Sequence, residues 1–437
     1  GIEYSDSQTV TGSTMTTAYT ITGGAGYKDA SFGIFFETGT APAAGTYTYT
    51  VIATATNSAG TVTGTAITDV SITVGALASA STTVAVASST AYLNAGTGTT
   101  ATEDASVSVV STAADTTHAT IEVTTLNAAG SAAAESITAT ISGPGLICVG
   151  STCGKSLVIA GDGSTSIGVR ADGTAGVATI TVKTTTVTFA TKSVTFFAAA
   201  ASAITAATNQ AVIGVVSATD VIRAVATDAA GTVWGGQAYI VAATAADALI
   251  AGSSTPVACT FDPTYKFHAC PVAGTAVGTA SFKVIDASTV ALATATSNAA
   301  AVTVSTSVAA SAKISFDKSS YAPGEKAIIT VSVLDAAGNA LPAKTVANVF
   351  AAVPTVSSAF SGTAPTFTTA ITIAGATSAA AGTVAGAQTY VAYMPFSSGD
   401  VTISATGSTG LSAAGRVAYT ATASVVNSSV DAATDAA

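Results

Sequence analysis

The chain has 437 residues, of which 49% are hydrophobic and only 8% are charged. Disordered chains combine low hydrophobicity with high charge, so this composition excludes a chain that is disordered throughout. The formal net charge is −10, and the 13 basic residues are scattered singly. The sequence therefore has no basic patch of the kind that binds nucleic acid or an anionic membrane surface.

The length corresponds to roughly three or four domains of ordinary size. Ala, Val, Thr and Ser dominate over Leu, and segments rich in Val and Thr favour pleated strands over helices. One uncharged stretch, Ser193 to Thr219, is long enough to cross a bilayer. It contains several polar residues, however, and a domain boundary is expected near Ala199. We therefore predict an all-β chain without a membrane span.

Residues 1–76 form the first predicted domain. Gly45 to Ala55 alternates with the period of two that a half-buried strand shows, the turn Asn57–Gly60 follows, and a second strand runs toward Val74. This run resembles the last two strands of the polycystic-kidney-type and related immunoglobulin-like modules of bacterial surface proteins. The resemblance implies a β-sandwich in which Tyr47 is the tyrosine-corner residue.

Two short markers recur in fixed order along the rest of the chain. The first is a turn of the form Asn/Asp-Ala-Ala-Gly, at Asn127–Gly130, Asp228–Gly231 and Asp335–Gly338. The second is a glycine that opens a β-rich run, at Gly176, Gly278 and Gly399. The paired marker glycines lie 46, 47 and 61 positions apart. Two landmarks in constant order indicate one domain type used in tandem.

The markers divide the remaining sequence into domains at residues 77–198, 199–306 and 307–426, followed by a tail at 427–437. We predict that Ala119–Leu126 pairs with Ser136–Ser142, and that Val221–Thr227 pairs with Ala238–Ala243. Strands of the fourth domain are predicted at Lys313–Asp317, Ala327–Leu334 and Thr345–Val349.

The first marker has the chemistry of a tight turn. Asn or Asp at its first position accepts backbone hydrogen bonds, and Gly at its fourth position adopts a positive φ. We interpret it as a hairpin connection between paired strands. The structural residues of these turns are Asn127, Gly130, Asp228, Gly231, Asp335 and Gly338.

The phrase Ser319–Asn339 resembles bacterial immunoglobulin-like domains of the invasin and surface-layer type. The resemblance implies tandem β-sandwiches of immunoglobulin-like or fibronectin-III-like type in an elongated array. It brings no catalytic residues with it, because many unrelated functions share this fold. It also implies a bacterial surface protein of the surface-layer or sheath type.

The four cysteines fall into two local pairs, Cys148 with Cys153 and Cys259 with Cys270. An even number of cysteines, paired within separate domains, predicts two disulfides formed in an oxidising compartment. Each closed loop is short, so each disulfide should contribute roughly 2–3 kcal/mol. The alternative is a metal site that uses His268, but one His and two Cys at this spacing do not form a zinc ligand set.

No cofactor is expected, with calcium left as the one alternative. Calcium needs six to eight oxygen ligands, which a single turn aspartate does not supply. The acidic residues that could contribute are Glu103, Asp104, Asp220 and Asp228.

Several apparent catalytic signals have simpler interpretations. Gly150 to Ser156 resembles a phosphate-binding loop, but only three residues separate its glycines where four are required. His118 is expected at the surface. Trp234 is expected to pack in a core, and the alternative is that its ring binds a sugar. No nucleophile motif is present, so we do not expect an enzyme.

The tail from Val430 to Ala437 repeats Asp-Ala-Ala at four-residue spacing, which is compatible with a helix. It resembles the start of the helical stalks of surface proteins from small freshwater actinobacteria. Asn427 begins an N-glycosylation sequon. The chain begins at Gly1, so an exported protein would have lost a leader before this residue.

The sequence favours a structural subunit of an extracellular lattice, sheath or tube at the cell surface, whose partners are copies of itself. Anchoring would use sequence beyond residue 437 or another protein. The alternative is an adhesin or fibre that binds glycans or another surface. For that alternative, the irregular stretch Ala351 to Ala387 is the candidate site, because long insertions often carry function.

Overall fold

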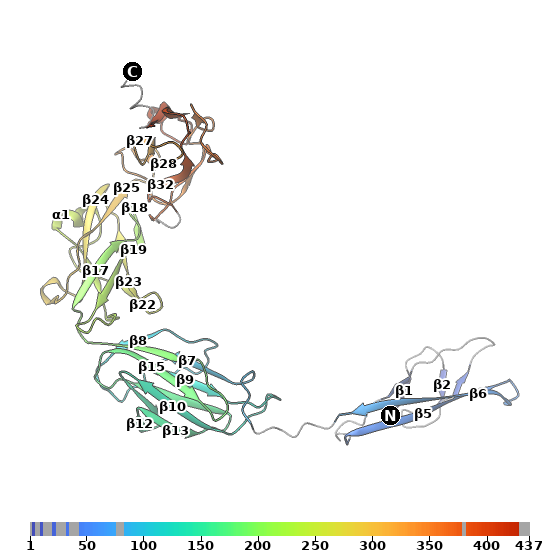
Figure 1. Cartoon of the computed structure of the whole chain (residues 1–437). Helices are drawn as coiled ribbons and strands as arrows, with labels where there is room; N and C mark the ends of the chain where they lie inside the picture. Colours follow the sequence, from blue (N-terminus) through green and yellow to red (C-terminus); the bar gives the residue numbers. More distant parts are fainter. Residues whose placement is uncertain are drawn as a thin grey trace. The chain divides into compact units, whose positions relative to one another are not determined.

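The computed structural model describes residues 43–75, 83–377 and 382–427, and the backbone of four short strands before residue 35. Within these residues the chain is almost wholly β, as predicted (Figure 1). The described helices are α1 (Ala245–Ile250) and the 3-10 helices η1 (Val290–Leu292) and η2 (Ala413–Gly415). The chain divides into two units, one formed mainly by residues 1–82 and one that starts at Thr83.

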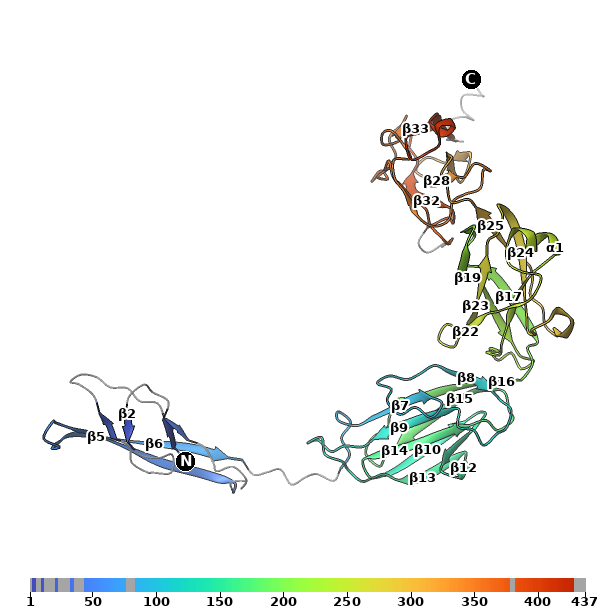
Figure 2. The same cartoon turned by 180° about the vertical axis from the view of Figure 1, so that it is seen from behind.

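The first unit contains a long two-stranded ribbon (Figure 2). β5 (Gly45–Thr56) pairs antiparallel with β6 (Val62–Val74), with a bulge next to Ala55. The turn Asn57–Gly60 connects the two strands, as the sequence predicts. The Tyr47 hydroxyl donates a 2.8 Å hydrogen bond to the carbonyl of Ala43, which is the backbone contact expected of a tyrosine corner. The short strands pair with one another, β1 (Ile2–Tyr4) with β4 (Phe32–Ile34) and β2 (Thr9–Thr11) with β3 (Thr20–Thr22).

The second sandwich has two five-stranded sheets. One has the order β13-β10-β15-β16-β8, with bounds Ser156–Ala160, Ser136–Ser142, Gly176–Lys183, Lys192–Phe197 and Val107–Val110. The other has the order β12-β11-β14-β9-β7, with bounds Thr152–Gly154, Leu146–Val149, Ser164–Arg170, Ala119–Thr124 and Thr90–Ala95. Between them lies a core that includes Leu93, Ile121, Ile180 and Phe196.

The third sandwich has sheets of four and five strands. One has the order β17-β19-β23-β22, with bounds Ala203–Thr208, Ser217–Thr227, Phe267–Ala273 and Thr260–Asp262. The other has the order β18-β25-β24-β20-β21, with bounds Val212–Gly214, Ala300–Ser305, Gly278–Ile285, Tyr239–Ala242 and Val257–Ala258. Its core runs from Phe197 to Val304 and includes Ile222, Trp234 and Phe282.

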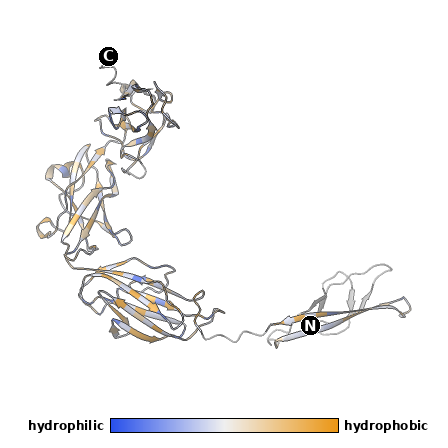
Figure 3. Ribbon diagram, viewed as in Figure 1, coloured by the Kyte–Doolittle hydropathy of each residue, from blue (hydrophilic) through white to orange (hydrophobic). Residues whose placement is uncertain are grey.

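The fourth sandwich has smaller sheets. These are β26-β28-β32 (Ser311–Phe316, Lys326–Leu334, Ala387–Tyr393), β27-β34-β33-β30 (Ser320–Tyr321, Ala418–Val425, Gly399–Thr406, Thr355–Val356) and β29-β31 (Thr345–Val346, Ile371–Thr372). Along β28 buried residues alternate with more exposed ones, and Figure 3 shows apolar residues spread along the strands of all the sandwiches. Such alternation places one face of the strand in the core.

The three sandwiches share two features of topology. In each, an early strand pairs parallel with the last strand: β8 with β16, β18 with β25, and β27 with β34. The second marker glycine always opens the strand that pairs with this last strand, and its φ is 144° at Gly176, 150° at Gly278 and 132° at Gly399. Such φ values favour glycine. The repeated markers therefore identify the same position of one recurring fold.

The first marker does not connect paired strands in these sandwiches, which corrects the hairpin interpretation. β9 and β10 flank the Asn127 turn but lie in opposite sheets, and the same is true of β19 and β20 around Asp228. Only single bridges close the turns, such as Leu126 with Ala132. Each marker is thus an arch that carries the chain from one sheet to the other. Local turn chemistry is identical in an arch and in a hairpin, so the sequence pattern does not distinguish them.

Candidate functional site: the junctions between the sandwiches

All the predicted turns, including Asn57–Gly60 of the first unit, form the same hydrogen bonds. In each, the Oδ1 atom of the first residue accepts bonds from the backbone N–H groups two and four residues later, at 2.9–3.0 Å. The glycine N–H donates to the carbonyl of the first residue, and φ of the glycine is 79–82°. This shared pattern explains why Asn and Asp both serve at the first position.

The two aspartates make one further bond, which the sequence analysis missed. The Oδ2 atom of Asp228 accepts a 2.9 Å hydrogen bond from the backbone N–H of Ala198, in the segment between the second and third sandwiches. Likewise, Oδ2 of Asp335 accepts a 3.0 Å bond from the N–H of Thr306, between the third and fourth. Both side chains are buried. Each carboxylate therefore stabilises a turn and holds the inter-sandwich segment that precedes its sandwich.

The surroundings of Asp335 favour its charged form. Burial alone would raise the pKa of this carboxyl. The hydrogen bonds from the backbone of Thr306, Asn339 and Ala337 outweigh burial and lower the pKa below its ordinary value. The bond to Thr306 is consequently a charge-assisted one, which is stronger than a bond between neutral groups.

Two consecutive phenylalanines link the second and third sandwiches. Phe196 is fully buried in the core of the second sandwich, whereas Phe197 belongs to the core of the third. The ring of Phe197 meets Trp234 edge-on, with 6.3 Å between the ring centroids. Its carbonyl accepts a 2.7 Å bond from the N–H of Ser111. Because side chains alternate along β16, adjacent residues point to opposite sides and enter two different cores.

The junction between the third and fourth sandwiches is more polar. Ser307 adopts a φ of 61°, and its N–H donates to the hydroxyl of Ser305. The ammonium group of Lys344 donates to the carbonyl of Ser307. Together with Thr306 and Asp335, these contacts fix the connecting backbone by hydrogen bonds, and the described residues show no shared aromatic packing here like that of the preceding junction.

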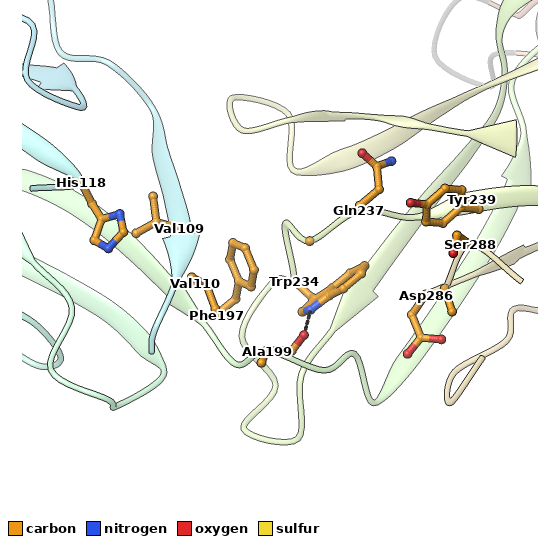
Figure 4. A pocket seen from close by; sticks show the side chains of 12 residues that line it. Val109, Val110, His118, Phe197, Ala199, Trp234, Gln237, Tyr239, Asp286 and Ser288 are labelled. Carbon is orange, nitrogen blue, oxygen red and sulfur yellow. Dashed lines mark hydrogen bonds between the residues drawn. The ribbon is translucent and has the colours of Figure 1, made fainter. Parts of the chain in front are cut away.

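A hollow of about 660 Å³ lies where the second sandwich meets the third (Figure 4). Its lining combines Val109, Val110 and His118 of the second sandwich with Trp234, Gln237, Tyr239 and Asp286 of the third, among others. His118, expected at the surface, is half-buried here, which corrects that expectation. Among the residues that the structure describes, its Nε2 atom has no hydrogen-bond partner. Burial lowers the pKa of His118.

Trp234 is a packing residue, as predicted, and is only 3% exposed. The centroid of its ring lies 5.7 Å from that of the His268 ring. The centroid of the Phe261 ring lies 4.9 Å from that of the His268 ring. Nε2 of His268 bonds to the carbonyl of Gly236 at 2.8 Å. Burial lowers the pKa of His268 more than its backbone hydrogen bonds raise it. His268 is therefore a neutral core residue next to the Cys259–Cys270 disulfide.

The acidic residues considered for calcium bind other groups. Asp104 pairs with the buried ammonium of Lys192 at 2.9 Å, and Asp220 pairs with Arg223 at 2.6 Å. Asp228 accepts only backbone N–H groups, as described above. Within residues 43–75, 83–377 and 382–427, no three His, Cys, Asp or Glu side chains gather as a metal-binding group. The structure therefore does not bring these carboxylates and Glu103 together in one site.

Both predicted disulfides are present, Cys148–Cys153 and Cys259–Cys270, and no cysteine is free. The first links directly opposite residues of β11 and β12. In the apparent phosphate loop beside it, Lys155 donates to the carbonyls of Gly143 and Gly145 and pairs with Asp172. Lys155 thus holds a neighbouring loop of the sandwich.

The insertion Ala351–Ala387 contributes to the core of the fourth sandwich. Its buried residues include Phe360, Phe367, Ile371 and Ile373. Residues 378–381 within it and residues 428–437 lie outside the described part, so the predicted helical tail and most of the Asn427 sequon also lie outside it. Among the described residues, no helix is long and apolar enough to span a membrane.

No protein-family model and no curated protein matches the sequence. Solved structures with similar folds include the Escherichia coli adhesin FdeC, at 17% identity and a TM-score of 0.24, covering 79% of this chain and 99% of that one. Invasin, a bacterial integrin-binding protein, matches at 14% identity and a TM-score of 0.25, and the match covers 77% of this chain and 60% of that one. Domains 5–6 of the S-layer protein SbsC match at 15% identity and a TM-score of 0.21, and the match covers 52% of this chain and 98% of that one. TM-scores this low carry no argument about function.

Proposed function

We propose that this protein is a structural subunit of an extracellular surface assembly, and that copies of it associate through the first unit. The β5–β6 ribbon is the observation that carries the proposal. It is a sheet of two strands, and neither outer edge pairs with another described strand. Two-stranded ribbons are marginally stable alone, and we propose that a strand of a second copy completes this one.

The edges of the ribbon carry little of the usual protection against pairing. Exposed edge strands of soluble proteins carry charges, prolines or bulges that prevent association, and this ribbon has a bulge only next to Ala55. β5 contains no charged residue and no proline, and β6 contains only Asp69. Ile52 and Ile67 lie opposite each other and are 60% and 66% exposed. The edge strand β5 is 12 residues long and carries no charge, so it is a template for strand addition by a second copy.

The two faces of the ribbon differ, which gives such pairing a defined orientation. Threonine and serine hydroxyls pair across one face, as between Thr48 and Ser71 at 3.1 Å. The opposite face carries Tyr47, Tyr49 and Ile72, which are half-buried. A one-residue slip would exchange these faces, so an amphipathic ribbon specifies the register of an added strand.

The two disulfides support an extracellular location, since such bonds persist in oxidising compartments. The apolar composition supports association, because small sandwiches leave part of their apolar surface exposed. A role as structural subunit, and not as an enzyme, agrees with the carboxylates and lysines of the candidate site, which are engaged in holding loops and junctions.

The test is assembly of the full chain, imaged by negative-stain electron microscopy and sized by light scattering. We expect regular arrays or filaments from the native chain and monomers from an Ile52→Lys, Ile67→Lys variant, because charges on an edge oppose strand addition. Val86→Lys, at a residue 71% exposed in the second sandwich, is the matched control and should assemble normally. Assembly of the double variant, or a native chain that stays monomeric, would refute the proposal.

A further inference from the structure

The hollow between the second and third sandwiches has the size of a ligand site. Its volume of about 660 Å³ falls within the range of pockets for small molecules. Both sandwiches line it, with Val109 and Val110 on one side and Gln237, Tyr239 and Ser288 on the other (Figure 4). Its lining residues all belong to the second unit, whereas the proposed assembly edge belongs to the first.

The walls of the hollow are held in place before any ligand binds. The N–H of Ala198 is bound by Asp228, and the next residue, Ala199, accepts a 3.4 Å bond from the indole N–H of Trp234. Phe197 is anchored in the third core while its carbonyl is bound by Ser111. A preformed site avoids the ordering cost that weakens binding by mobile segments.

The charges around the hollow exclude ionic ligands. None of its lining residues is Lys or Arg, so a phosphate or carboxylate would find no counter-charge. The only carboxylate in the lining is Asp286, and its oxygens already accept bonds from the backbone N–H groups of Thr294 and Ala295 and from the Thr294 hydroxyl. A cation would therefore have to displace existing hydrogen bonds.

The polar groups that remain are neutral and both donate and accept. Among the described residues, the Tyr239 hydroxyl has no hydrogen-bond partner, and it points back toward Gln237 and Trp234 (Figure 4). The amide nitrogen of Gln237 donates to the carbonyls of Ala238 and Cys259 at 2.8 Å, which fixes the side chain and leaves its oxygen as an acceptor. Nε2 of His118 also has no hydrogen-bond partner among the described residues, but this atom is buried, so Tyr239 and Gln237 supply the polar groups of the hollow.

We propose that this hollow binds a neutral saccharide. Sugar rings present hydroxyl groups, which can pair with the Tyr239 hydroxyl and the Gln237 oxygen. They also present apolar C–H faces, which fit the walls formed by Val109, Val110 and Phe197. Peptides are recognised mainly through strand pairing, helix grooves or charged groups. The lining offers no Lys or Arg for an acidic peptide, so the saccharide is the ligand that its chemistry favours.

The chain contains a single tryptophan, and it lines the hollow, which gives the test a local signal. The full-length protein would be titrated with neutral oligomers of glucose, mannose and N-acetylglucosamine while Trp234 fluorescence is recorded. We expect a saturable change with at least one of them. Tyr239→Phe keeps the ring and removes the hydroxyl, and should weaken binding about threefold to tenfold.

Tyr265→Phe is the matched control, since Tyr265 is 75% exposed and does not line the hollow. It should bind as the native chain does. Unchanged circular dichroism would show that both variants are folded. The proposal is overturned if no neutral saccharide gives a saturable signal, if Tyr239→Phe binds as tightly as the native chain, or if only neutral peptides bind.

Discussion

The turns at Asn127 and Asp228 occupy the same place in consecutive sandwiches and differ by one side-chain atom. Both use Oδ1 to accept two N–H groups of their own turn. Among the described residues, the hydrogen bonds of the Asn127 side chain stay within that turn, whereas Oδ2 of Asp228 also binds Ala198. An amide nitrogen donates and does not accept, so Asn has no atom that could receive this bond. The turn needs only the Oδ1 acceptor, whereas the junction also needs the Oδ2 acceptor. Only aspartate has both.

The largest effect should come from Asp228→Asn, which makes the third sandwich resemble the second. The variant keeps the turn acceptor but places an amide donor opposite the N–H of Ala198. We expect a loss of about 1–3 kcal/mol, the cost of leaving a buried donor unpaired. Denaturation followed by Trp234 fluorescence reports this sandwich, and hydrogen exchange at Ala198 should become faster. The reverse change, Asn127→Asp, should bring no gain in stability; a gain would contradict the comparison.

Acid should affect the third sandwich before the fourth, because only the third buries a histidine. The folded-state pKa of His268 is lowered by burial. Its contribution is therefore complete above the unfolded value of about 6.5 and declines as the pH falls toward the folded value, by up to about 1.4 kcal/mol per pH unit. Unfolding followed by Trp234 fluorescence between pH 7.5 and 5 (roughly the range in which histidine titrates) measures this. His268→Gln should flatten the pH dependence; an unchanged slope would exclude His268 as its source.

The glycines at the ends of the turns should respond alike, since they belong to the shared part of the motif. Gly130 and Gly231 have φ values of 80° and 79°, and a Cβ at either would meet no atom within 4 Å. Replacement by Ala therefore costs only the left-handed backbone conformation, about 1–2 kcal/mol. Thermal unfolding of Gly130→Ala and Gly231→Ala should show losses that agree closely. A much larger loss at Gly231 would mean that the glycine also serves the junction.

The smallest effect should be the acid response of Asp335. Its folded-state pKa lies below the ordinary value because backbone N–H groups bind its oxygens. The stability that it contributes is thus present above the unfolded pKa of about 3.9, and it is lost as the pH falls through the folded value. Hydrogen exchange at Thr306 should accelerate in that range. In the Asp335→Asn variant, the Thr306 amide should exchange rapidly at every pH. If exchange at Thr306 in the native chain did not depend on acid, the carboxylate would not hold this junction.

Much of the fold follows from local patterns. The period-two runs located three strands of the fourth sandwich, at β26, β28 and β29, and the spacing of Cys148 with Cys153 and of Cys259 with Cys270 predicted both disulfides. For the candidate site, the turn hydrogen bonds could be predicted from the sequence, but the bonds to the inter-sandwich segments could not. The sequence named Asp228 and Asp335 as turn residues, and the exchange of Asn for Asp at a constant position was the available signal for a further role.

The sequence by itself determined where strands and turns form, because alternation and turn hydrogen bonds involve residues within a few positions of one another. Only the tertiary structure decided what each turn connects. The same Asn or Asp motif joins paired strands in the ribbon at Asn57 and crosses between sheets at Asn127, Asp228 and Asp335. That choice depends on which distant strand edge is free to pair, as β14 is for β9. The bond from Ala198 to Asp228 likewise spans 30 residues, and no local pattern encodes it.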